Sequence, residues 1–221
     1  MRLDVLLVKR GLFNSRQRAK EAIRRGFVSV EGEIVDKASK EVKEDARIEI
    51  LCNRVDVPVG YWKLKWLDGH FRLINPGDVV LDLGSSAGGF LLYASEKARR
   101  VYGIECSSMF REALRAIEAK RANVRFFPED VFKFDIQKIE DDIDVILNDL
   151  TLDGCSSKKA LSRFLPKLKR GGRVLFVHKT GFEREIDFSD IPELEVVAKL
   201  NAEDRRKKEI YYLLQHPKRL F

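Results

Sequence analysis

Charged side chains follow most of the apolar runs in the sequence after residue 60. They are Asp82, Glu105, Asp130, Asp149, Lys179 and, beside the last run, Glu209. Ligands of open α/β sheets bind beyond the carboxyl ends of the strands, so this set predicts a binding or catalytic site at one rim of a sheet. A single acid at a strand end is as often a helix cap, and the prediction therefore rests on the whole set.

A glycine-rich segment, residues 84–89, directly follows the first of these runs. Its spacing matches neither G-x-G-x-x-G nor the P-loop, so a phosphate cradle is not expected. Asp82 before the segment would attract an ammonium group, Glu105 is placed to accept two ribose hydroxyls, and Asp130 is placed to accept from an adenine amine. This combination predicts S-adenosyl-L-methionine as the cofactor. The predicted cofactor-binding residues are Asp82, Gly84, Ser85, Ser86, Gly88, Gly89, Glu105 and Asp130.

The elements that would position these residues alternate between strand and helix. Strands are predicted at residues 79–83, 101–105, 124–127, 145–149, 173–178, 194–197 and 210–214. Helices are predicted at 90–94, 109–119 and 158–168, the last ended by Gly171-Gly172. Such alternation is typical of an α/β fold with a parallel, doubly wound, Rossmann-like sheet and helices on both faces.

The excess positive charge lies at the N-terminus. Lys and Arg exceed Asp and Glu by 42 − 35 = 7 over the 221 residues, and by 8 − 2 = 6 within residues 1–30. Asn14-Ser15 and Gly26 bound one of two short basic helices, and strand-like segments follow at 27–30, 33–35 and 46–50. This predicts a small α+β module. The module carries a cluster of basic residues, Arg16, Arg18, Lys20, Arg24 and Arg25. Such a cluster is equally consistent with phosphate binding and with a charged face that is simply exposed to solvent.

Pro58 and Gly60 mark residues 52–60 as a linker, which gives predicted domains at 1–51 and 61–221. The apolar runs are far shorter than a membrane span, and residues 1–10 lack a signal-peptide core, so a cytoplasmic location is expected. The three cysteines have no histidine partners nearby, so neither a disulfide framework nor a metal site is expected. The oligomeric state is not predicted.

About 48 residues at the N-terminus resemble the S4 RNA-binding domain. The features that carry the resemblance are Arg2-Leu3-Asp4, Leu6-Leu7, Arg10-Gly11, Ser15-Arg16, Ala19, Ile23, Gly26, Val28, Val30 and Gly32. The resemblance implies that Arg16, Arg18, Lys20, Arg24 and Arg25 contact RNA. Glu31 departs from the family, which usually has Asn before the turn glycine.

Residues 60–214 resemble the FtsJ-type RNA 2′-O-methyltransferases, and the S4 domain before them makes the arrangement similar to the haemolysin A-type (TlyA) rRNA methyltransferases. The family's Lys-Asp-Lys-Glu catalytic tetrad corresponds to Lys63, Asp149, Lys179 and Glu209. The resemblance implies methylation of a ribose 2′-hydroxyl, with ribosomal RNA or ribosomal subunits as partners. The departures are Ser85 in the glycine-rich segment, Leu150-Thr151 after Asp149, and Thr180 after the second lysine.

In this chemistry Lys179 is expected to take the hydroxyl proton, because a ribose hydroxyl is a poor nucleophile at neutral pH. Lys63 would disfavour the charge of Lys179, Asp149 would orient both lysines, and Glu209 would hold Lys63 or the ribose. Like charge lowers a lysine pKa and carboxylates raise it, so the sequence leaves the net shift open. Without the family spacing these residues would be two ordinary surface ion pairs.

Two other functions stay open. A base methyltransferase usually carries Asn/Asp-Pro-Pro-aromatic, whereas Leu150-Thr151 follows Asn148-Asp149. A ribosome-binding protein could keep the cofactor fold without catalysis. Tyr61, Trp62 and Phe182 could stack an RNA base but are more often core residues, and His178 is expected in the core. No amphipathic or membrane-spanning segment supports a membrane-lytic toxin.

Overall fold

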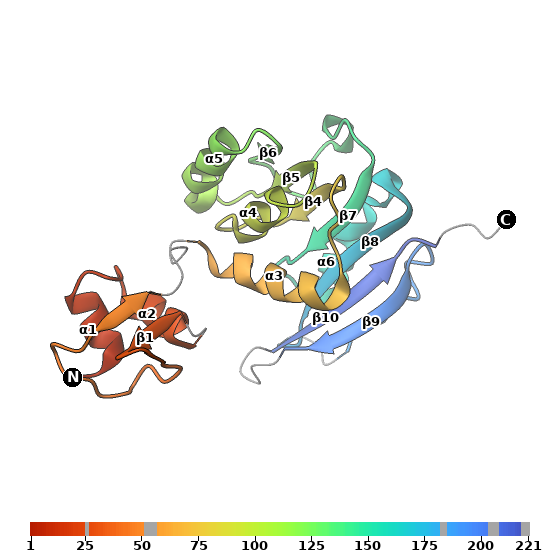
Figure 1. The fold of residues 1–221 in the computed structure, drawn as a ribbon. Coiled ribbons are helices and arrows are strands. Elements are labelled where there is room, and N and C mark those ends of the chain that lie inside the picture. Colours follow the sequence, from red (N-terminus) through yellow and green to blue (C-terminus); the bar gives the residue numbers. More distant parts are fainter. Residues whose placement is uncertain (25–26, 51–56, 182–184, 203–207, 218–221) are drawn as a thin grey trace. The chain divides into compact units, whose positions relative to one another are not determined.

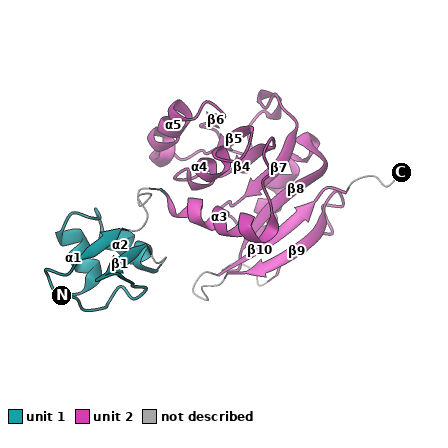
Figure 2. Ribbon diagram, in the orientation of Figure 1, with its two compact units in different colours: residues 1–57 teal, residues 58–221 magenta. Residues whose placement is uncertain are grey.

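The computed structural model describes residues 1–24, 27–50, 57–181, 185–202 and 208–217. The chain divides into two compact units, Met1–Val57 and Pro58–Phe221 (Figure 2). Each unit buries a hydrophobic core of its own. The helix α3 begins at Val59, so the last two residues of the expected linker are helical, while residues 52–56 lie outside the described residues.

The N-terminal unit is the expected small α+β module. It contains α1 (Leu3–Lys9), α2 (Arg16–Arg24), β1 (Val28–Val30), β2 (Glu33–Ile34) and β3 (Ile48–Ile50). The strands form an antiparallel sheet in the order β2-β1-β3. Leu3, Leu7 and Ile23 are fully buried between the helices and the sheet. Ser15 starts α2 as expected, since its hydroxyl accepts from the amide of Arg18 at 3.3 Å.

The larger unit is built on a seven-stranded sheet (Figure 1). The strands are β4 (Val79–Leu83), β5 (Arg100–Ile104), β6 (Val124–Phe127), β7 (Ile143–Asn148), β8 (Leu168–Lys179), β9 (Glu195–Asn201) and β10 (Glu209–Gln215). The α-helices are α3 (Val59–Phe71), α4 (Gly89–Ser95), α5 (Arg111–Lys120) and α6 (Gly154–Ser162). Short 3₁₀ turns lie at η1 (Ser108–Phe110), η2 (Ile136–Lys138) and η3 (Leu165–Lys167).

The strand order is β6-β5-β4-β7-β8-β10-β9. The five strands from β6 to β8 are parallel, which confirms the expected Rossmann-like core. The expected parallel pairing does not extend to the last two strands, because β10 pairs antiparallel with both β8 and β9. Only residues 202–208 separate β9 from β10, which is fewer than the dozen or so that a parallel crossover needs.

Two expectations about helices are also corrected. The helix expected at 158–168 ends at Ser162, and Pro166 lies in the 3₁₀ turn that follows, where a continuing α-helix would lose a hydrogen bond. Gly171 and Gly172 therefore lie inside β8 and do not end a helix. No described helix combines the length and the apolar character that a membrane span requires.

The helix α3 is the element that the sequence did not predict. Tyr61, Leu64 and Leu67 are buried, but Trp62 and Trp66 make the opposite side apolar as well, so the helical period is hard to read. α3 lies beside α4 (Figure 1) and carries Lys63, the first lysine of the predicted tetrad.

Candidate active site

Four residues expected to act together meet at one rim of the larger unit. Lys63 lies on α3, Asp149 directly follows β7, Lys179 ends β8, and Glu209 begins β10. The parallel strands β7 and β8 end at the same rim, and β10 begins there because it runs antiparallel to β8. These four residues are called the tetrad below.

The tetrad is a closed ring of alternating charges. Lys63 Nζ lies 2.8 Å from Asp149 Oδ2 and 3.1 Å from Glu209 Oε2. Lys179 Nζ lies 2.6 Å from Asp149 Oδ1 and 2.7 Å from Glu209 Oε1. The side chains are only 11–20% exposed. Each lysine therefore bridges both carboxylates, an arrangement with much less solvent screening than surface ion pairs have.

The electrostatics of the ring favour the charged forms of Lys179 and Glu209. Burial alone would lower the pKa of Lys179, but the charges and hydrogen bonds of Asp149 and Glu209 outweigh burial and raise that pKa. Burial would likewise raise the pKa of Glu209, but Lys63 and Lys179 outweigh it and hold the pKa at about 2. The net shift that the sequence left open is thus upward, and Lys179 keeps its proton in the resting protein.

Tyr211 is a further residue at the tetrad, which sequence reasoning missed. Its hydroxyl donates to Glu209 Oε2 at 2.9 Å, and Lys63 Nζ lies 5.5 Å from the centre of its ring. Tyr211 follows Glu209 by two positions on β10, so both side chains point to the same face of the sheet. That spacing was the available signal. Tyr211 fixes one carboxylate oxygen and covers one lysine.

The position of Lys63 depends on a close approach between two helices. A Cβ on Gly89 of α4 would lie 2.5 Å from the amide nitrogen of Tyr61 and 2.7 Å from Cα of Gly60 on α3. Side chains cannot approach backbone so closely, so this crossing requires glycine at position 89. Gly89 was expected to contact the cofactor. The structure gives it this packing role.

The other end of α3 is anchored by Asp68, whose buried carboxylate accepts three hydrogen bonds. The donors are the amide of Ile74 at 2.8 Å, the Tyr93 hydroxyl at 2.7 Å and the Lys97 ammonium. Tyr93 and Lys97 belong to α4 and the turn after it, so the two helices are joined by polar contacts as well as by packing. Burial would raise the pKa of Asp68, but these donors outweigh burial and lower it.

Asp82 lies on β4, next to the strand that leads to Asp149. It is 1% exposed, and neither carboxylate oxygen has a hydrogen-bond partner in the described part of the chain. Burial raises the pKa of Asp82 to about 8, and the negative charges of Asp149 and Glu105 add to the effect. A buried carboxyl without a donor is costly, and an incoming ammonium group would relieve this cost.

The two other expected acceptors are held by backbone amides. Glu105 accepts from Ser86 N at 2.9 Å and from Ser107 N at 2.8 Å. Asp130 accepts from Phe132 N at 2.9 Å. Both carboxylates are half-buried, at the ends of the neighbouring strands β5 and β6. The three expected acids therefore lie at or just beyond the carboxyl ends of the adjacent strands β4, β5 and β6, in the order that a ligand lying along the rim would meet them.

The glycine-rich segment bends sharply between β4 and α4. Gly84 and Gly88 have φ of +78° and +81°, a region that favours glycine. A Cβ added to Gly84 would lie 2.7 Å from the Leu150 side chain. A Cβ added to Gly88 would lie 2.2 Å from the Ile117 side chain. Ser85 is buried and its hydroxyl donates to the carbonyl of Asp82 at 3.4 Å, while Ser86 donates to Glu105 through its amide.

The basic residues of the N-terminal unit gather partly around a buried acid. Asp4 is fully buried, and its Oδ2 lies 2.9 Å from Arg16 Nη2 and 3.8 Å from Lys20 Nζ. Arg2 contacts Oδ1 at 3.0 Å. Arg16 and Lys20 nevertheless remain 53% and 39% exposed. Asp4 thus fixes the positions of Arg16 and Lys20, while both side chains stay exposed enough to contact a ligand.

The remaining expected RNA-contacting residues follow on α2. Arg18 is exposed, and Arg24 is exposed with Glu21 at 3.8 Å. Arg25 lies outside the described residues, as does Phe182. Tyr61 is a core residue, with its hydroxyl donating to Glu96 at 2.8 Å, and His178 is buried as expected.

The FtsJ-like methyltransferase family matches residues 57–178, more than half of the chain. The chain belongs to this family. The S4 domain matches residues 1–48, which confirms the expected pairing of an S4 domain with an FtsJ-like domain. The FtsJ-like match includes Lys63 and Asp149 but ends one residue before Lys179, so the inclusion of Lys179 and Glu209 rests on the geometry above.

Curated relatives carry ribosomal RNA methyltransferase names. "Putative rRNA methyltransferase YqxC" of Bacillus subtilis is 31% identical over 132 residues, which are 57% of this chain and 47% of that protein. This chain therefore spans about half the length of that relative. "Ribosomal RNA large subunit methyltransferase E" of Legionella pneumophila strain Lens is 30% identical over 171 residues, 69% of this FtsJ-like chain and 81% of the relative.

The fold is shared with a putative hemolysin from Streptococcus thermophilus. The TM-score is 0.61 at 20% identity, and the match covers 98% of this chain and 88% of that one. The two-unit architecture of this FtsJ-like protein thus has a solved counterpart.

Proposed function

We propose that this chain transfers a methyl group from S-adenosyl-L-methionine to a ribose 2′-hydroxyl of ribosomal RNA. The observation that carries the proposal is the closed tetrad beside Asp82, a buried carboxyl that has no donor among the described residues. The family membership and the names of the relatives support methyl transfer and an rRNA substrate. Assembled ribosomal subunits are a second form of this substrate, and the proposal implies a cytoplasmic location.

The residues along the rim fit the proposed cofactor. Asp82 would receive the methionine ammonium, Glu105 the ribose hydroxyls and Asp130 the adenine amine, because these acids are acceptors and the three cofactor groups are donors. When bound, S-adenosyl-L-methionine supplies an electrophilic methyl group on a cationic sulfonium, and its positive charge opposes the charge of a nearby lysine.

Lys179 is the proposed proton acceptor. The ribose 2′-oxygen would bond to the methyl carbon as the bond from that carbon to the sulfonium sulfur breaks, which would leave the neutral thioether S-adenosyl-L-homocysteine. The proton of the 2′-hydroxyl would pass to the neutral Nζ of Lys179. Asp149 and Glu209 position this nitrogen at 2.6 Å and 2.7 Å from their oxygens. They also keep it protonated in the resting protein, so Lys179 must lose its proton before the transfer. Lys63 neutralises the second oxygens of the same carboxylates.

The test is transfer of radiolabelled methyl groups to ribosomal RNA and to ribosomal subunits, followed by alkaline hydrolysis. A 2′-O-methyl group blocks cleavage of the adjacent phosphodiester, so ribose methylation leaves label in alkali-resistant dinucleotides. We expect that outcome for the wild type and its loss in Lys179→Ala. Label in mononucleotides would establish base methylation instead. A protein that binds the cofactor but labels no ribosomal substrate would contradict the proposed activity.

A further inference from the structure

The outward face of α3 is aromatic and basic. Trp62, Lys65, Trp66 and His70 recur at helical spacing on this face, whereas Tyr61 and the leucines of the opposite side are buried. Lys65 and His70 are exposed, and both tryptophans are half-buried. A surface helix normally carries polar residues at such positions, so two tryptophans there need an explanation. The four residues are called the α3 face below.

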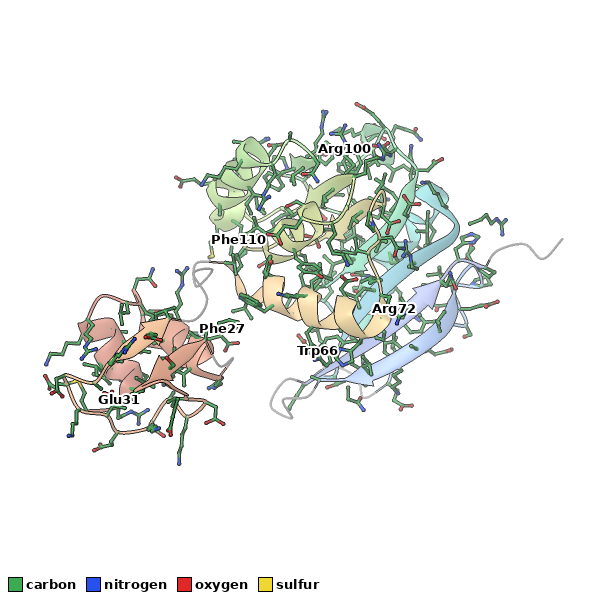
Figure 3. All side chains as sticks on the ribbon, in the orientation of Figure 1. Phe27, Glu31, Trp66, Arg72, Arg100 and Phe110 are labelled. Atoms are coloured by element: carbon green, nitrogen blue, oxygen red, sulfur yellow. The ribbon has the colours of Figure 1, made fainter. Side chains whose placement is uncertain are left out.

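The α3 face is continuous with the tetrad. Trp66 follows Lys63 by one helical turn, and its ring lies 5.9 Å from that of Tyr211 on β10 in an edge-on contact (Figure 3 labels Trp66 on α3). Tyr211 in turn donates to Glu209 and covers Lys63. Aromatic packing through the buried Tyr211 therefore connects the proposed reaction centre to the half-buried Trp66 on the helix.

The net positive charge of this region comes from lysines outside the tetrad. Two lysines and two carboxylates make the ring neutral, so it provides no net attraction for a phosphate backbone. Lys65 and Lys208 are exposed neighbours of tetrad residues in the sequence, and the described part of the chain shows neither in an ion pair. Lys65 Nζ lies 5.2 Å from the Trp62 ring. A cation beside an aromatic face suits a base and its phosphate together.

We propose that the α3 face binds single-stranded RNA next to the nucleotide to be methylated. A flanking base stacks on Trp66, and its phosphate lies at Lys65. This inference rests on the proposed function for the identity of the substrate. Base stacking on aromatic side chains tolerates many sequences and requires unpaired bases, so the α3 face selects unpaired RNA and leaves sequence selection to other contacts.

The composition of the chain offers a direct experiment. Trp62 and Trp66 are its two tryptophans, so the intrinsic tryptophan fluorescence of the full chain reports only on this face. The probe is a single-stranded RNA of mixed sequence, about 12 nucleotides long, within the usual range of site sizes. We expect it to quench the emission, and we expect little quenching by the same RNA annealed to its complement.

Variants then separate stacking from folding. Trp66→Phe keeps a flat ring and should bind nearly as the wild type does. Trp66→Leu should weaken binding of the single strand by about 5- to 150-fold, measured by anisotropy of a labelled oligonucleotide. The cofactor affinity of both variants, measured by calorimetry, should stay unchanged. Lys65→Gln should reduce the slope of log K against log salt by about 0.7, and the exposed Lys120→Gln on α5 should not.

Several outcomes would overturn the inference. One is binding of the oligonucleotide by anisotropy with no change in tryptophan emission, which would place all RNA contacts elsewhere. Equal affinities of Trp66→Leu and wild type would do the same. Emission that responds to ribosomal subunits but not to RNA would assign the face to a protein partner. Quenching without methyl transfer would retain the RNA site and reject the proposed activity, so the two failures are distinguishable.

Discussion

Lys179 and Glu209 are direct cross-strand partners on β8 and β10, and their side chains meet at 2.7 Å. Thirty positions separate them in the sequence. The antiparallel pairing of β10 with β8 places the first residue of one strand opposite the last residue of the other, at the rim where Asp149 also lies. The geometry of the tetrad is therefore a property of the strand register.

Replacement of Lys179 tests its role as the proton acceptor. Lys179→Gln removes the accepting nitrogen and should reduce methyl transfer by about 10²- to 10⁴-fold. Lys179→Arg keeps the charge but should not restore the rate, because a guanidinium does not give up its proton near neutral pH. Single-turnover transfer of labelled methyl groups measures both. An active Lys179→Arg variant would show that Lys179 acts through its charge alone.

The raised pKa of Lys179 predicts an alkaline rise in the rate of methyl transfer. The rate should increase with pH as the fraction of neutral Lys179 grows. Glu209→Gln removes one of the carboxylates that favour the charged form, so the pKa of Lys179 should fall and the rise should move to lower pH. A shift in the pH at which the rate rises would identify Lys179 as the titrating group, whereas a lower maximum rate alone would not. An unmoved profile would mean that another group titrates.

The raised pKa of Asp82 predicts that cofactor binding releases a proton. At about pH 6.5 the buried carboxyl, with a pKa of about 8, carries a proton in the free protein, and the cofactor ammonium should displace it. Calorimetry in buffers of different ionisation enthalpy should give close to one proton released per cofactor bound. Asp82→Asn should bind more weakly and release none. Proton release by that variant would assign the titration to another group.

The crossing of α3 and α4 predicts opposite effects for two glycine substitutions. Gly89→Ala places a methyl group against the backbone of Gly60 and Tyr61 and should destabilise the FtsJ-like unit by about 1–3 kcal/mol. Gly69→Ala on α3 meets nothing within 4 Å and should stabilise it by up to about 1 kcal/mol. Thermal unfolding followed by circular dichroism measures both. Similar shifts in the two variants would argue against the close approach.

The buried Asp4 predicts that the S4 domain is sensitive to acid. Burial would raise the pKa of Asp4, but hydrogen bonds from Arg2 and Arg16 outweigh burial and lower it below its value in the unfolded chain. The stabilisation is therefore present above the unfolded pKa and is lost as the pH falls. Protection factors of the α1 amides, in which the intrinsic exchange rate at each pH is divided out, should fall on acidification in the wild type. In Asp4→Asn these protection factors should be lower at neutral pH and depend less on pH.

Local patterns predicted much of the fold. The strand ends, the glycine-rich segment and the basic N-terminus are readable because apolar runs, turn residues and charge are local properties. The antiparallel β10 was not predicted, because strand direction depends on connection length and pairing. The α3 helix was missed because Trp62 and Trp66 hide its period. Asp68 acts through its contact with the distant Tyr93, and Tyr211 covers the distant Lys63, which periodicity does not show.

The cross-strand pairing of Lys179 with Glu209 also constrains how this protein can vary. Successive side chains of a strand point to opposite faces, so inserting one residue within β10 would turn Glu209 or the strand's apolar side away from its partners. Length changes between β9 and β10, at residues 202–208, leave that alternation intact. Related sequences should therefore tolerate insertions in this connection and keep a fixed spacing from Glu209 to the end of the strand.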